Sequence, residues 1–330
     1  MQIDLRTVTL KPQRNTFDHV ARRLGGDKPA SRYQEGTFDI QATHHFHYRP
    51  LWDPDHEIHD PSRTAIQMKD WYAFKDPRQY YYGTYVVARG RQQEAAEASF
   101  TLFEERGLAA TLPAAVRATA QDTLVPLRHV EWAGNMNNAS VCAYGYGTAI
   151  TAPAMYHAMD HLGVAQYLTR IGLALDGPGA LDGAKKAWLE DPRWQPLRRY
   201  VEDTLVTKDW FELFVAQNLV LEGVLYPLVF DHLDRALAAK GGAALSPLTR
   251  FMAEWFDESS RWIDAQLKTA ASESADNRSL LAGWARRWLD RAMEAVAPVA
   301  RHAFGDAAPA VLDRVTSDLT ARAARAGVAL

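Results

Sequence analysis

The sequence predicts an all-α protein, in which a bundle of long helices (residues 79–330) follows an irregular N-terminal arm (residues 1–78). Three observations predict this architecture. From residue 79 onward, apolar residues recur with the period of a helix, and the apolar–polar alternation of strands is nearly absent. Glycine and proline interrupt this pattern at few places, so the predicted helices are long. Before residue 79, prolines recur along the chain and no helical period is found.

The arm is too long to be an ordinary loop within a compact domain. It carries the aromatic residues Phe38, Phe46, Tyr48 and Trp52, which a solvated tail would not need. We therefore predict an extended arm that orders against a partner chain. A floppy tail is the alternative. The residues predicted to bind the partner are Phe46, Tyr48, Arg49 and Trp52. The prolines that break helices here are Pro12, Pro29, Pro50, Pro54, Pro61 and Pro77.

Helix start and stop signals divide the remaining chain into eight predicted helices. Gly107 is a candidate C-cap, Gly177 to Gly179 and Gly241 to Gly242 are stops, and Ser246-Pro247 is a candidate N-terminus. The predicted helices span residues 79–106, 112–138, 153–175, 188–200, 209–240, 246–270, 277–303 and 308–326.

Composition argues against several classes of function. The net charge of −3 gives no reason to expect a nucleic-acid partner. Cys142 is the only cysteine, so an intramolecular disulfide and a site built on several thiolates are excluded. The longest apolar run, residues 219–230, contains Glu222 and is too short to span a membrane. Residues 1–10 lack an apolar run of signal-peptide type. We expect a cytoplasmic protein.

Two groups of histidines are candidate metal ligands. His44, His45, His47, His56 and His59 lie in the arm, where no rigid element fixes them, so polar packing is the favoured interpretation. His157 and His161 lie one helical turn apart, a spacing that can bind zinc. Because no third ligand is identifiable, a structural role is favoured for this pair.

A different pattern points to carboxylate-bridged di-iron bundles. In these, two helices each supply one Glu and two others each supply Glu-x-x-His. In this chain His129 is preceded at the third position by Pro126, which offers no ligand atom. Glu258 is followed at the third position by Arg261, a permanent cation that cannot bind a metal. One motif has therefore lost its Glu and the other its His.

Single-Glu positions of this arrangement also have candidates. Glu222 lies on the helix before the second degenerate motif, and Glu94 and Glu97 lie on the first long helix.

Blocks along nearly the whole chain resemble the β subunit of bacterial multicomponent monooxygenases, most closely the phenol hydroxylase branch. The blocks that carry this resemblance are 27–35 (DKPASRYQE), 46–50 (FHYRP), 52–53 (WD), 76–83 (DPRQYYYG), 124–131 (LVPLRHVE), 135–138 (NMNN), 159–160 (MD), 162–163 (LG), 202–206 (EDTLV), 209–212 (DWFE) and 226–229 (YPLV).

The resemblance implies a ferritin-like fold and a structural subunit that contains no metal and has no catalytic residue. It implies a catalytic α subunit that carries the di-iron centre and a small γ subunit, in an α2β2γ2 oxygenase. A regulatory protein would dock on the oxygenase, and a reductase would deliver electrons from NADH through FAD and an iron–sulfur centre. The complex would convert phenol to catechol.

Loss of the iron would leave buried carboxylates without a counter-charge, which is costly. We therefore predict that Arg261 forms a buried ion pair with Glu222, Glu258 or both. An exposed i,i+3 pair of little energy is the alternative. We also predict that Pro126 bends its helix, which would turn His129 into a hydrogen-bonding residue of the core.

Three other functions compete with this interpretation. An active di-iron oxidase would have to work with a degenerate site. A β subunit of a toluene or alkene monooxygenase is the second; the sequence favours phenol hydroxylase, but the resemblance implies that β chains do not contact substrate, so the sequence does not specify it. A free-standing helical binding module would leave the N-terminal arm unexplained.

Overall fold

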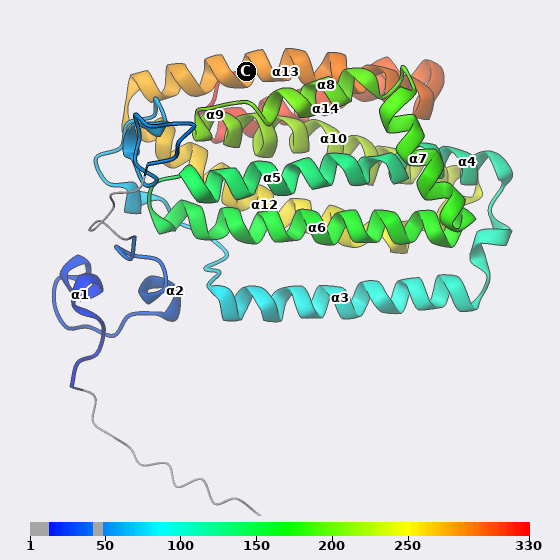
Figure 1. The fold of residues 1–330 in the computed structure, drawn as a ribbon. Coiled ribbons are helices and arrows are strands. Elements are labelled where there is room, and N and C mark those ends of the chain that lie inside the picture. Colours follow the sequence, from blue (N-terminus) through cyan, green and yellow to red (C-terminus); the bar gives the residue numbers. More distant parts are fainter. Residues whose placement is uncertain (1–12, 42–48) are drawn as a thin grey trace, which may run out of the picture.

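The computed structural model describes residues 13–41 and 49–330, and no strand occurs among them. Long helices lie side by side in layers, and most of the arm lies at one end of them (Figure 1). The longer helices are α3 (Tyr82–Glu105), α4 (Ala114–Leu124), α5 (Arg128–Tyr144), α6 (Thr148–Asp176), α7 (Pro178–Glu190), α8 (Gln195–Thr204), α12 (Ser246–Glu273), α13 (Ala275–Phe304) and α14 (Ala308–Arg325). The predicted all-α class is confirmed.

Helices α5 and α6 form an antiparallel hairpin at the centre of the bundle (Figure 1). Their connection is short because Gly147 adopts a φ of 89°, which residues with a side chain rarely do. The hairpin is cross-linked where the Asn135 side-chain amide donates to the Ala158 carbonyl at 2.8 Å. Residues 131 and 161 therefore face each other across it.

The helix that was predicted to bend at Pro126 is interrupted there. A 3-10 turn at Val125–Leu127 separates α4 from α5, because proline cannot donate the backbone hydrogen bond that a continuous helix requires. The region after Gly177 differs from the prediction. Pro178 begins α7, and a break at residues 191–194 separates α7 from α8, so the single predicted helix 188–200 is wrong. Proline suits the first turn of a helix, where no N–H is needed.

Residues 210–242 form one long run of helix in which α-helical and π-helical turns alternate. The α-helical parts are α9 (Trp210–Phe214), α10 (Glu222–Tyr226) and α11 (Leu233–Leu237); the π-helical segments are Val215–Leu221, Pro227–His232 and Ala238–Gly242. The Asp209 carboxylate accepts from the backbone N–H groups of Phe211 and Glu212 and so caps the start. Gly241, with a φ of 92°, ends the run where the sequence predicts a stop.

Aromatic side chains fill the interior. Trp194, Trp210, Trp255 and Trp262 are fully buried, which accounts for much of the high aromatic content. The run from Trp210 to Glu273 contains an apolar window that could cross a membrane by length and composition, but 94% of that window is buried inside the protein, as in the core helix of a soluble protein.

The arm has two parts. Its first part contains the short helices α1 (Asp18–Leu24) and α2 (Arg32–Glu35), which lie apart from the long helices (Figure 1). Its second part, residues 61–78, packs on the bundle of its own chain, where Ile66 and Phe74 are fully buried. The Asn277 side-chain amide donates to the Gln67 carbonyl at 2.8 Å. This half of the arm therefore packs on the helical bundle of its own chain.

Candidate functional site

A buried polar cluster lies where α5, α6, α10 and α12 meet. We call Glu131, His157, His161, Glu222 and Tyr226 the inner cluster; all are buried. His161 Nδ1 is 2.7 Å from Glu131 Oε2, and His161 Nε2 is 3.3 Å from Glu222 Oε1. The His161 ring thus lies between two carboxylates that come from different helices.

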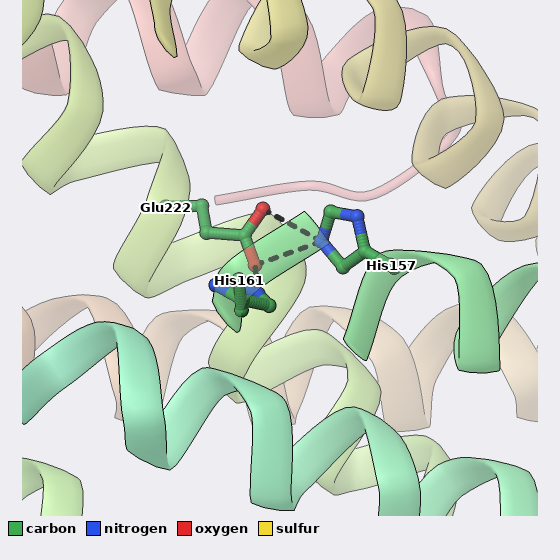
Figure 2. Close-up of side chains that lie close together, drawn as sticks. All are labelled: His157, His161 and Glu222. Atoms are coloured by element: carbon green, nitrogen blue, oxygen red, sulfur yellow. Dashed lines mark hydrogen bonds and ion pairs between the residues drawn. The ribbon is translucent and has the colours of Figure 1, made fainter. Parts of the chain in front are cut away.

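The other members complete the cluster. His157 Nε2 is 3.1 Å from each Glu222 carboxylate oxygen, so both histidines of α6 face the same acid (Figure 2). The Tyr226 hydroxyl donates to Glu131 Oε2 at 2.8 Å. Because His157 and His161 are four residues apart on one helix face, a single α-helix can present both rings to Glu222.

Charge interactions outweigh the cost of burial at His161 and Glu222, whereas burial prevails at Glu131, whose pKa it raises, and at His157, whose pKa it lowers. Burial alone would lower the pKa of His161, but hydrogen bonds and charge interactions with Glu131 and Glu222 raise it to about 10. Burial would likewise raise the pKa of Glu222, but His157 and His161 lower it to about 2. His161 is therefore a cation at neutral pH, held between the two carboxylates.

The cluster is closely packed on all sides. The Trp255 ring stacks on His157 at a centroid distance of 4.9 Å and meets His161 edge-on at 5.4 Å. On α5, a Cβ at Gly134 would lie 2.6 Å from two atoms of the His161 ring, so glycine is required there for the ring to fit.

A second group of charges lies beside the inner cluster, toward α3. We call Asp76, Arg78, Arg89, Asp160 and Glu258 the arginine network. Arg89 forms paired hydrogen bonds to Asp160 at 2.6 and 2.7 Å and to Glu258 at 2.9 and 3.1 Å. Arg78 pairs with Asp76 at 2.9 Å and reaches Glu258 at 3.5 Å.

Trp255 joins the two groups. Its indole N–H donates to Asp160 Oδ2 at 2.7 Å, while its ring lies against the histidines of the inner cluster. Asp160 also accepts from the Tyr85 hydroxyl at 2.8 Å. Each Asp160 oxygen therefore accepts hydrogen bonds from one charged and one neutral donor.

The inner cluster lies where a four-helix bundle of this kind builds a di-iron centre, but its residues do not fit one. Such a centre needs one Glu from each of two helices, which Glu131 and Glu222 match, and Glu-x-x-His from the other two. On α6 the inward pair is Ala158-x-x-His161, and on α12 it is Ser259-x-x-Trp262; all four residues are buried. Two of the four carboxylates and one of the two histidines are thus missing.

Whether the inner cluster could bind a single divalent cation is a separate question. Ligand atoms of His157, His161 and Glu222 lie within 4.8 Å of one another, the one such group found among the residues that the structure describes. Three ligand atoms can face one ion, but they cannot hold two irons. The inner cluster does not coincide with the predicted degenerate motifs, because Pro126, His129, Glu258 and Arg261 all lie outside it.

His129 lies at the half-buried edge of α5. Its ring stacks on Trp188 at 5.6 Å, and burial, followed by the charges of Arg128 and Lys185, lowers its pKa to about 4. His129 therefore packs at the edge of the bundle, outside the inner cluster. The predicted hydrogen bond is wrong, because His129 Nε2 is buried without a partner and the ring packs against an indole.

The predicted ion pair of Arg261 is wrong. Arg261 is exposed on α12. In the described part of the chain, Glu222 forms its ion pairs with histidines, and Glu258 forms its ion pairs with Arg78 and Arg89. The physical reason is the phase of the helix. Trp255, Ser259 and Trp262 face inward, so position 261 points to solvent.

Two of the predicted partner-binding residues, Phe46 and Tyr48, lie outside the described residues, as do His44, His45 and His47. Trp52 is 67% exposed and contacts Tyr144 edge-on at 5.4 Å. Arg49 is exposed and donates to the Pro54 carbonyl at 3.2 Å. His56 lies 2.9 Å from an Asp53 carboxylate oxygen, an interaction within the arm.

Sequence reasoning did not identify Glu131, Asp160 or Arg89 as site residues. Glu131 and Asp160 carried a signal, because each is an acid at an inward position of an otherwise apolar helix face. Arg89 carried none: its partners are 71 and 169 residues away along the chain.

Comparison with known proteins identifies the family. The sequence profile of the Methane/Phenol/Alkene Hydroxylase family matches residues 52–274. The chain is 50% identical to the phenol 2-monooxygenase oxygenase component DmpL of Pseudomonas sp. (strain CF600), over 99% of this chain and 98% of that protein. It is 28% identical to the β subunit of the toluene-4-monooxygenase hydroxylase component of Ectopseudomonas mendocina, over 71% of this chain and 74% of that protein.

Among solved structures, phenol hydroxylase from Pseudomonas sp. OX1 superimposes with a TM-score of 0.93 at 45% identity, over 99% of both chains. The ferritin-like fold expected from the sequence resemblance is therefore confirmed. The chain belongs to the Methane/Phenol/Alkene Hydroxylase family, on the branch of the phenol hydroxylase β-type oxygenase subunits.

Proposed function

We propose that this chain is the structural, metal-free β subunit of the oxygenase component of a cytoplasmic multicomponent phenol hydroxylase. The complex would convert phenol, O2, NADH and a proton to catechol, NAD+ and water. The catalytic α subunit would carry the di-iron centre, a small γ subunit would complete an α2β2γ2 assembly, and a regulatory protein would dock on it. A reductase with FAD and an iron–sulfur centre would take the electrons from NADH.

The observation that carries this proposal is the composition of the inner cluster. The two buried carboxylates of Glu131 and Glu222 already have a counter-charge in the cation of His161. The Trp255 and Trp262 rings lie against His157, at 4.9 and 5.3 Å, on the side where α12 would have to supply two ligands. A site arranged in this way stabilises the bundle and leaves oxygen chemistry to another chain.

High identity to a phenol 2-monooxygenase component favours phenol as the substrate of the complex over toluene or benzene. The N-terminal arm is the second part of the proposal. Arg49 and the largely exposed Trp52 would contact a partner subunit, together with the neighbouring Phe46 and Tyr48.

Metal content and turnover test the proposal. We would purify the chain alone and in complex with its α and γ subunits, measure iron and other metals by mass spectrometry, and assay catechol formation with reductase and regulatory protein. We expect neither metal nor turnover in the lone chain, and we expect both in the complex. About two irons in the lone chain would overturn the proposal.

A control separates bound metal from contamination. His157→Gln and His161→Gln variants of the lone chain should contain the same trace of metal as the unmodified chain. One metal per unmodified chain that both variants lose would show that His157, His161 and Glu222 hold a single ion, and the metal-free part of the proposal would then fail.

A further inference from the structure

The first part of the arm has cross-links of its own. We call residues 13–41 the strap; it contains α1 and α2. Tyr33 and Phe38 are buried, and their rings meet edge-on at 6.3 Å. Asn15 donates to the Asp27 carboxylate twice, from its backbone N–H at 2.7 Å and from its side-chain amide at 3.2 Å. The strap is therefore held in shape by contacts within itself.

The seam between the strap and the rest of the chain is hollow. A cavity of about 610 Å3 lies along it, lined by Tyr33 and Phe38 from the strap and by Tyr72 and Lys75 from the segment that packs on the bundle, among others. Figure 1 shows α1 and α2 apart from the long helices. Because the walls of a cavity lack the dispersion contacts of a closely packed interior, apolar packing contributes little to holding the strap in place.

One side chain joins the two walls of this cavity. The Arg23 guanidinium, on α1 of the strap, donates to Asp39 at 2.7 and 2.9 Å and to Asp70 at 2.7 and 3.2 Å. It also lies over the Phe38 and Tyr72 rings, 5.7 and 5.2 Å from their centroids. Asp39 and Phe38 belong to the strap. Asp70 and Tyr72 belong to the other wall, so Arg23 binds one carboxylate and one ring from each side of the seam.

Local backbone structure fixes both carboxylates. Asp70 accepts from the backbone N–H of Tyr72 at 2.9 Å and so caps the short 3-10 helix Trp71–Ala73. Asp39 has a φ of 51°, a conformation that Asp and Asn adopt more readily than other residues with a side chain. Asp39 therefore orients Arg23 from within the strap, and Asp70 offers it a carboxylate that is already in position across the seam.

Solvent reaches these ion pairs. The side chains of Arg23, Asp39 and Asp70 are 28%, 33% and 47% exposed. Salt weakens interactions between solvent-exposed charges, whereas it screens buried pairs much less. The attraction between Arg23 and Asp70 should therefore weaken as the ionic strength rises.

The remaining hydrogen bonds found across the seam, between residues that the structure describes, join neutral groups. The backbone N–H of Asp76 donates to the Tyr33 hydroxyl at 2.8 Å, and the backbone N–H of Gly147 donates to the side-chain carbonyl of Gln41. These two amides lie on the bundle side, but their acceptors lie on the strap. Each amide therefore loses its acceptor when the strap moves away, even if nothing unfolds.

We propose that the strap is a salt-sensitive clasp, which opens and closes as one body against the bundle and is held closed by the ion pair of Arg23 with Asp70. Opening breaks this pair and the neutral hydrogen bonds across the seam, and it leaves the contacts within the strap and the bundle core intact. Such local openings require much less free energy than unfolding. The open state exposes the rings around the cavity, so the strap controls access to an aromatic surface. The inference goes beyond the proposed function and does not depend on it.

Hydrogen exchange of the full chain tests the proposal. Exchange would be followed at single amides by mass spectrometry with fragmentation, at about 0.05 M and about 1 M salt. The amides of Asp76 and Gly147 report on opening. The amide of Phe38, which donates to the Gln34 carbonyl at 2.9 Å within the strap, reports on unfolding of the strap itself.

The variants are Arg23→Gln, Asp70→Asn and the double variant. Asn keeps the ability to cap the 3-10 helix, so Asp70→Asn removes the charge alone. Arg22→Gln is the matched control, because Arg22 is the exposed neighbour of Arg23 and no ion pair of it is found in the described part of the chain. A thermal melt of each variant would show that its bundle is folded.

At low salt we expect the amides of Asp76 and Gly147 to exchange about tenfold faster in either single variant than in wild type. The double variant should be no faster than the single ones, because both substitutions remove the same ion pair. High salt should accelerate these two amides in wild type but not in the variants. The amide of Phe38 should exchange alike in all proteins, and Arg22→Gln should match wild type.

Each contrary result would overturn the proposal. If neither single variant is faster than wild type, the ion pair does not hold the strap closed. If the amide of Phe38 is accelerated as much as those of Asp76 and Gly147, the strap unfolds and does not open as one body. If wild type exchanges alike at both salt concentrations, the clasp is not sensitive to salt.

Discussion

The inner cluster and the arginine network solve the same problem with different cations. Both neutralise carboxylates inside the bundle, where an unpaired charge is costly. The arginine network uses Arg78 and Arg89, whose guanidinium groups stay charged at any physiological pH, near the α3 side of the bundle. The inner cluster uses His161, a group that loses its proton once the pH is high enough. Only the inner cluster therefore makes the stability of this subunit depend on alkaline pH.

The largest effect is expected from Arg89→Met. It leaves Asp160 buried with only the Tyr85 and Trp255 donors, and leaves Glu258 with the distant Arg78. Breaking a buried ion pair by removing one partner costs about 3–5 kcal/mol of unfolding free energy. Urea denaturation followed by tryptophan fluorescence measures it.

The exposed pair of Arg250 and Glu254 provides the control for that experiment. Arg250→Met should change the unfolding free energy by less than about 1 kcal/mol. Equal losses in the two variants would mean that the arginine network does not stabilise the fold.

Removal of the cation from the inner cluster is expected to rank next. His161→Gln leaves Glu131 and Glu222 without the charge between them, with an expected loss of about 3 kcal/mol at neutral pH. Of the two acids, His157→Gln affects Glu222 alone, and it should cost about 1 kcal/mol. The two variants would be compared by the same denaturation assay. A larger loss for His157→Gln would reverse the roles assigned to the two histidines.

Gly134→Ala tests the packing of the inner cluster rather than its charge. The added methyl group would overlap the His161 ring and push it from between the two carboxylates. Overpacking of this kind costs about 1–3 kcal/mol. Gly163→Ala is the matched control, because a Cβ there meets nothing within 4 Å. A thermal melt in which both variants match wild type would show that the ring has room to move.

Alkaline pH separates the two groups without a change in the arginine network. The pKa of His161 is raised from 6.5 to about 10 on folding, so its contribution is complete below pH 6.5 and is lost as the pH rises through about 10. Between pH 6.5 and about 10, the unfolding free energy of wild type should fall by about 1 kcal/mol per pH unit more than that of His161→Gln. Parallel denaturation curves of the two proteins from pH 7 to 10 would contradict the assignment of the charge to His161.

The smallest effect is expected from Arg261→Met. Its side chain is exposed, so the unfolding free energy should stay within about 0.5 kcal/mol of wild type. A loss of several kcal/mol would restore the buried ion pair that the sequence suggested, and with it the role of Arg261 as the replacement for a metal.

The sequence was sufficient for the fold class and for several helix ends, because helix periods, proline breaks and glycine stops are local signals. The interruption of the helix at Pro126 and the stop at Gly241 are examples. The candidate site was predicted only in part. Glu222 was identified as a buried acid of the bundle, and His157 and His161 as residues on one helix face, but the counter-charge was assigned to a sequence neighbour, Arg261.

Two physical reasons explain the error. A helix of 28 residues buries one face, and only the packing against its neighbours decides whether position 258 or 259 faces the centre. In addition, the residues that neutralise the acids come from distant segments. Glu131 is 30 residues from His161, and Arg89 is 169 residues from Glu258, so spacing within one helix could not reveal either pair.

About one turn of α6 carries side chains that face three different surroundings. His157 and His161 point to the inner cluster, Asp160 points to the arginine network, and Met159 is partly exposed to solvent. Such a helix cannot roll about its axis by even a fraction of a turn without disturbing all three surroundings together. A single inserted or deleted residue here would rotate the rest of the helix by about 100°. The length of α6 before this turn should therefore tolerate no change.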